Sequence, residues 1–66
     1  MDFMKKKIKE LDVVALLRDF PDRDIVSGQV GTVVEILDDG VFEVEFSDEQ
    51  GKPYAMFAVN VEDLQK

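Results

Sequence analysis

Apolar and polar residues alternate most regularly in the middle of the chain, between Gly28 and Phe46. A period of two over such short runs is typical of β-strands that bury one face. The polar segment Asp38-Asp39-Gly40 interrupts the pattern, and its glycine can adopt the positive φ that a tight turn requires. This stretch therefore predicts two antiparallel strands joined by a three-residue loop.

The three-residue loop fixes the register of the predicted hairpin. A two-residue loop would mix polar and apolar side chains on each face, which the periodicity of a sheet disfavours. The preferred register pairs Leu37 with Val41, Ile36 with Phe42, Glu35 with Glu43, Val34 with Val44, and Thr32 with Phe46. With the alternation of the other strands, it predicts a core of Val13, Ala15, Val34, Ile36, Phe42, Val44, Phe46 and Phe57.

Strand patterns also flank this hairpin. Residues 11–18 are rich in Val and Leu and predict a first strand, which ends at Phe20-Pro21 because proline cannot donate to a sheet. A turn over residues 48–52 precedes another alternating strand, which begins at Pro53. Residues 61–64 predict one closing helical turn capped by Asn60.

The predicted fold class is all-β. We expect a small SH3-like barrel of four to five antiparallel strands, with at most a short terminal helical turn. Residues 10–66 form its single domain. Residues 1–9 are a basic lead-in, for which two readings stay open: a helical turn around Met4, Ile8 and Leu11, or a frayed end.

The composition excludes several kinds of chemistry. The chain has no cysteine and no histidine, so it lacks disulfides, thiolate ligands and the most common general base. Asp19, Asp22 and Asp24 do not have the spacing of a calcium-binding loop. We therefore predict no cofactor, no metal site and no enzymatic activity.

Charge indicates what kind of partner the chain can bind. The net charge is −7, and from Glu10 to Lys66 fourteen acids oppose four bases. Such a surface repels nucleic-acid phosphates and favours either simple solubility or a partner with a basic surface. The longest apolar run, Val13 to Leu17, is too short to cross a membrane, so we expect a cytoplasmic protein.

Five residues are candidates for contact with a partner. The predicted register sets Glu35 opposite Glu43, with Glu45 beside them, although like charges in such positions weaken a sheet. A cationic partner would offset this repulsion, whereas a merely solvated face would tolerate it. Phe20 and Tyr54 are aromatic residues that can anchor an interface or simply be half-buried.

Three segments of the chain resemble a known family. They are Asp12-Val-Val-Ala-Leu16, Gly28-Gln-Val-Gly-Thr-Val-Val-Glu35 and Phe42-Glu-Val-Glu-Phe46. They are similar to a family of small bacterial proteins of unknown function, and the second also resembles the KOW element of ribosomal proteins and transcription factors. The resemblance implies an SH3-like fold but brings no catalytic residues. KOW modules carry Lys and Arg around this strand, where the present chain has Glu35, Asp38 and Asp39.

Together these patterns predict a non-enzymatic, acidic protein-binding module. It would be an accessory or regulatory subunit, such as an antitoxin-like or immunity-like inhibitor of a basic enzyme, and a monomer or weak homodimer. The alternative is a KOW-like nucleic-acid or ribosome-associated module that uses Lys5, Lys6, Lys7 and Lys9.

Overall fold

The computed structural model describes residues 7–66. The strands are β1 (Val13–Leu16), β2 (Val30–Asp38), β3 (Val41–Ser47), β4 (Pro53–Asn60) and β5 (Leu64–Gln65). Two 3-10 turns, η2 (Pro21–Arg23) and η3 (Val61–Asp63), precede β2 and β5. The prediction of a small all-β protein with four to five antiparallel strands and at most a short helical turn is confirmed, and the number of strands is five.

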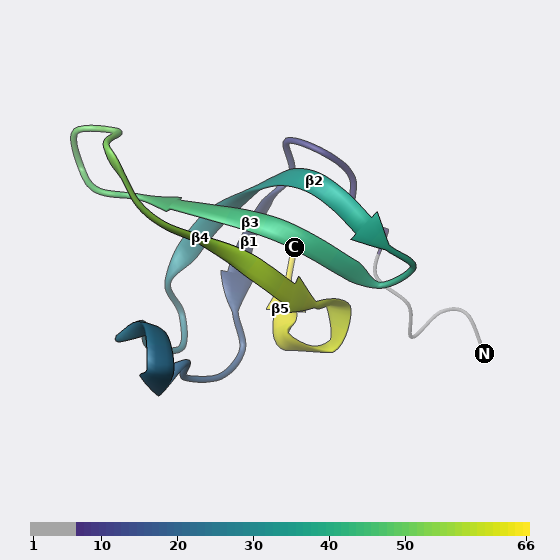
Figure 1. Ribbon diagram of the computed structural model, residues 1–66, viewed down its shortest axis with the longest axis horizontal. Helices are drawn as coiled ribbons and strands as arrows, with labels where there is room; N and C mark the ends of the chain where they lie inside the picture. The colour runs from purple at the N-terminus through teal and green to yellow at the C-terminus, as the bar shows by residue number, and fades with distance from the viewer. Residues whose placement is uncertain (1–6) are drawn as a thin grey trace.

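All five strands belong to one antiparallel sheet with the order β4-β3-β2-β1-β5. The sheet curves around its core, and β3 and β4 cross the molecule as a long hairpin, whose turn projects at the upper left of Figure 1. The chain passes from β4 through η3 directly into β5, which pairs with β1. This order and the short turn before the last strand are those of an SH3-like barrel.

The core lies on the concave side of the sheet. Phe46, Val44 and Val33 are fully buried there, and Phe46 stacks on Phe57 with 5.3 Å between ring centroids. The remaining buried apolar side chains are Ile8, Val14, Leu16, Ile25, Phe42, Val59 and Leu64. Ile8 belongs to the predicted lead-in, residues 1–9, and the structure places its side chain in the core.

A β-bulge in β2 changes the predicted register. Ile36 pairs with Phe42 and Glu35 with Glu43, as predicted, but Val44 then pairs with Val33 rather than Val34. Val34 is the extra residue of the bulge. On the N-terminal side of the bulge, the inward-facing residues of β2 are therefore one position earlier in the sequence than predicted, with Val33 in the place of Val34. The predicted pairs of Val34 with Val44 and of Thr32 with Phe46 are therefore wrong, and Thr32 lies opposite Glu45.

The turn of this hairpin is also shorter than predicted. Asp38 pairs with Val41, which leaves Asp39-Gly40 as a two-residue turn, and a second register shift at Leu37 absorbs the difference. Gly40 has the expected positive φ, 76°. This second shift, and not the bulge at Val34, reconciles a two-residue turn with the pairing of Ile36 and Phe42, an arrangement that strict alternation does not allow.

Four of the predicted core residues are not buried. In β1 the buried residues are Val14 and Leu16, whereas Val13 is exposed and Ala15 only partly covered. Val14 pairs with Gly31, whose missing side chain leaves space for the core, and this sets the inward face of β1. Val34 is displaced by the bulge, and Ile36 faces inward at the rim and is half exposed.

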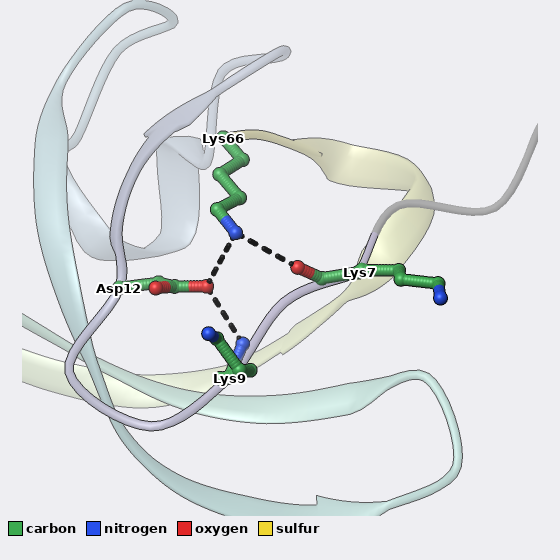
Figure 2. Close-up of polar contacts among 4 residues, drawn as sticks. All are labelled: Lys7, Lys9, Asp12 and Lys66. Atoms are coloured by element: carbon green, nitrogen blue, oxygen red, sulfur yellow. Dashed lines mark hydrogen bonds and ion pairs between the residues drawn. The ribbon is translucent and has the colours of Figure 1, made fainter.

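A polar cluster holds residues 7–12 against the end of β5. Asp12 Oδ2 accepts a hydrogen bond from the Lys9 backbone N–H at 2.8 Å and lies 3.2 Å from Lys66 Nζ. The same Lys66 ammonium donates to the Lys7 carbonyl oxygen at 3.1 Å (Figure 2). This cluster fixes the chain on both sides of Ile8. It contains Lys7 and Lys9, two of the basic residues of the lead-in, whereas Lys5, Lys6 and the predicted Met4 contact lie outside the described residues.

Gly31 tests the packing of the core. An added Cβ would lie 2.8 Å from the side chains of Phe46 and Val44. Gly31→Ala should therefore lower the free energy of unfolding by about 1–3 kcal/mol, as overpacking of a core does. Urea unfolding of Gly31→Ala, Phe46→Leu and the double variant measures this. The double variant should lose less stability than the sum of the single variants, because leucine makes room for the new methyl group. Strict additivity would contradict the contact.

The Asp12 cluster predicts a pH dependence. The Lys9 N–H, followed by the Lys66 ammonium, holds the pKa of the Asp12 carboxyl below its ordinary value of 3.8. Because the pKa is lower in the folded chain, the cluster stabilises the fold above about pH 3.8, and this contribution is lost as pH falls through the folded pKa. Asp12→Asn should thus reduce the melting temperature at pH 6 and approach wild type near pH 2. Glu49→Gln, with the same charge change in an exposed turn, is the control. A difference independent of pH would refute the assignment.

Candidate functional site

The convex side of the sheet is the candidate site. This outer face carries the strand side chains that alternate with the buried ones. Three strands contribute Val13 of β1, Val30, Thr32 and Glu35 of β2, and Glu43 and Glu45 of β3, and β4 adds Met56 and Ala58. The exposed Tyr54 lies two residues before Met56, at the register shift in β4.

One row of paired residues crosses the whole outer face. Val13 lies opposite Thr32, Thr32 opposite Glu45, and Glu45 opposite Met56. The next row joins Glu35, Glu43 and Ala58. Adjacent strands lie about 4.8 Å apart, so neighbours in a row are in contact range. The outer face is therefore one continuous surface.

This surface combines carboxylates with exposed apolar side chains. Val13, Val30, Tyr54 and Met56 expose between 50% and 61% of their area. Single exposed apolar residues are ordinary, whereas several on one face commonly mark a contact surface. Glu43 and Glu45 lie between them and are partly covered.

The charge of the outer face is one-sided. The five strands contain four acidic residues and no lysine or arginine. Within residues 7–66 the ion pairs are Arg18 with Asp63 and Lys66 with Asp12, and neither includes a glutamate of the outer face. A cation from another molecule would find carboxylates there that no cation of residues 7–66 occupies.

Four of the five predicted contact residues lie near one another. Glu35 and Glu43 are directly paired, and Glu45 is the next outward residue of β3. Tyr54 lies two residues before Met56 in β4, at the register shift near Pro53. Tyr54 is half exposed. Val13, Val30 and Ala58 are not among the predicted contact residues, and Val13 was predicted to lie in the core.

Phe20 is not part of this surface. It lies in the β1–β2 loop and packs against the core, with its ring centroid 5.3 Å from that of Phe57. The Arg18 guanidinium lies 3.9 Å from the Phe20 ring centroid, and Arg23 lies 4.7 Å from that of Phe57. The structure therefore gives Phe20 a packing contact with Phe57, on the inner side of β4, and does not bring it to the glutamates.

Two other features lie apart from the outer face. A cavity of about 580 Å³ lies at the end of the core beside Ile8, Ile36, Phe42 and Val61, and its rim carries both lysines and aspartates. In the β1–β2 loop, the Asp19 carboxylate accepts a hydrogen bond from the Ser27 N–H at 2.8 Å. Across residues 7–66, no three acidic side chains come together as metal ligands. No helix in that range is long and apolar enough to span a membrane.

The sequence of this chain is similar to that of a known protein family. The model of a domain of unknown function, DUF4926, matches residues 10–66. The chain belongs to the DUF4926 family. The predicted resemblance to a family of unknown function is thus confirmed, over all five strands of the barrel. No curated protein and no solved structure matches the chain. The description of the DUF4926 family names no function.

The paired glutamates make a prediction about stability. Like charges directly opposite each other in a sheet cost a few tenths of a kcal/mol. Glu35→Gln and Glu43→Gln should each raise the free energy of unfolding by about 0.2–0.5 kcal/mol at low salt, and the double variant should gain less than the sum. The gain should shrink at high salt, which screens exposed charges. Urea unfolding with Glu62→Gln as control measures it, and fully additive gains would show that the two carboxylates do not interact.

Proposed function

We propose that this DUF4926 protein is a non-enzymatic protein-binding module that recognises the basic surface of a partner through its outer face. The observation that carries the proposal is the set of carboxylates of Glu35, Glu43 and Glu45, which have no cation beside them on the strands. The exposed Tyr54 and Met56 next to them supply apolar contact area of the kind that anchors interfaces.

The role that fits these features is that of an accessory or regulatory subunit. A small acidic domain can cover a cationic active site or groove, as antitoxin-like and immunity-like inhibitors of basic enzymes do. The overall charge of −7 would also speed association with such a partner, because long-range attraction raises the rate of encounter. Neither cysteine nor histidine is present to support a common nucleophilic or general-base mechanism.

Affinity capture from cells of the source organism tests this proposal. The tagged wild-type chain should retain a basic protein in a salt-sensitive manner. Glu43→Gln/Glu45→Gln should weaken that capture about tenfold, as expected for two charge pairs at an interface. Glu49→Gln/Glu62→Gln removes two carboxylates outside the strands and should leave capture unchanged.

Two results would overturn the proposal. One is equal capture of the same partner by both double variants, because the outer face would then not be the contact. The other is tight, salt-sensitive binding of a mixed-sequence single-stranded RNA by the wild-type chain, because this would favour the KOW-like nucleic-acid function.

A further inference from the structure

Among the described residues, the strand at one edge of the sheet is paired along only one of its two edges. β4 is the terminal strand in the order β4-β3-β2-β1-β5, and within residues 7–66 it pairs only with β3. It runs for eight residues, Pro53–Asn60, whereas β5 at the opposite edge has only two. Figure 1 shows β4 along the border of the long hairpin.

The register shows which backbone groups face this free edge. The Val61 N–H donates to the Gly40 carbonyl at 2.8 Å, so Val61 directs its backbone groups toward β3. Backbone groups alternate in direction along a strand, and Val59, Phe57 and Ala55 therefore also face β3. The N–H and C=O groups of Met56 and Ala58, between Tyr54 and Asn60, point away from the sheet.

β4 lacks most of the features that prevent an edge strand from pairing. Proteins commonly protect such edges with lysines, internal prolines, bulges or very short strands. β4 contains no charged residue, its one proline is at its first position, and the only register shift lies at its beginning, near Pro53. From Tyr54 to Asn60 the edge is therefore open to an added strand.

The charges beside this edge indicate what kind of strand fits. A strand added to β4 would place alternate side chains on the outer face, next to Met56 and Ala58. On the β3 side of β4, Glu43 lies opposite Ala58 and Glu45 lies opposite Met56. The two strands that flank β4 are about 10 Å apart, and the single methyl group of Ala58 leaves room for a lysine or arginine to extend over it toward Glu43.

We propose that β4 accepts an extended, basic segment of the partner protein as a sixth strand, with lysine or arginine at alternate positions facing the glutamates. This proposal rests on the proposed function and names the form in which the partner binds. A second copy of the chain fits less well, because β4 carries no lysine or arginine and self-pairing would leave Glu43 and Glu45 without cations.

Amide hydrogen exchange of the full chain, followed by NMR, tests the edge directly. The probe is an acetylated and amidated eight-residue peptide of alternating lysine and valine. In the free protein the amides of Met56 and Ala58 should exchange rapidly, while those of Phe57 and Val59 are protected by β3. A saturating peptide concentration at low salt should slow exchange at Met56 and Ala58 at least tenfold. N-methylation of one alternate set of peptide amides should abolish binding, and methylation of the other set should not.

Protein variants provide the matched controls. Met56→Lys adds a positive charge at the free edge and should weaken peptide binding at least tenfold. Val13→Lys makes the same change at the far end of the same row of residues and should have no such effect. Ala58→Pro removes an N–H that β3 does not use, so the chain should keep its circular dichroism spectrum and lose the peptide.

Each contrary outcome is distinct. No binding of the peptide at millimolar concentration and low salt overturns the proposal, as does binding that leaves the Met56 and Ala58 amides unprotected. Protection of these amides in the free protein that increases with protein concentration identifies a second copy as the occupant and also overturns it. The capture and exchange experiments can also disagree. If the Glu43→Gln/Glu45→Gln variant no longer captures the partner, but the peptide leaves the Met56 and Ala58 amides of the wild-type chain unprotected, the proposed function stands and the edge proposal fails.

Discussion

The bulge at Val34 determines which side chains of β2 face the core and which lie on the outer face. On its N-terminal side Gly31 and Val33 face the core, and beyond it Ile36 does, so the inward face skips from a spacing of two to one of three. Without the extra residue, β2 could not pair both Val33 with Val44 and Glu35 with Glu43. The extra residue therefore allows Val33 to be buried opposite Val44 while Glu35 stays on the same side of the sheet as Glu43.

Sequence patterns predicted the elements of this fold better than their faces. The glycine of the turn at Gly40, the proline at the start of β4 and the alternation after it each have a local physical cause, and these features were found where expected. The bulge has no such local signal, because Val33 and Val34 are equally suited to burial. Likewise, the run from Val13 to Leu17 contains apolar residues at both alternate sets of positions. Its inward face is set by pairing with Gly31, which is a property of the assembled sheet.

The candidate surface was accessible to sequence reasoning only in part. The glutamates were placed together because their pairing depends on the turn at Gly40, which is close in sequence. Phe20 was grouped with them on its aromatic character alone, whereas its position depends on a long loop that folds over Phe57. The free edge of β4 was also out of reach, since it follows from the order of strands. A wide acidic face and an unprotected strand edge lie side by side only in the assembled sheet.

The contact between Lys66 and residues 7–12 has a consequence for the connectivity of the chain. Because Lys66 Nζ reaches both Asp12 and the Lys7 carbonyl, the two ends of the described segment lie within a side chain's length of each other. A few glycines would be enough to join residue 66 to residue 7. A circular permutant opened at Gln50-Gly51, in the exposed turn between β3 and β4, would then retain every strand pairing of the barrel. Sequence order is thus a less stringent requirement for this architecture than the contact of Lys66 with residues 7–12.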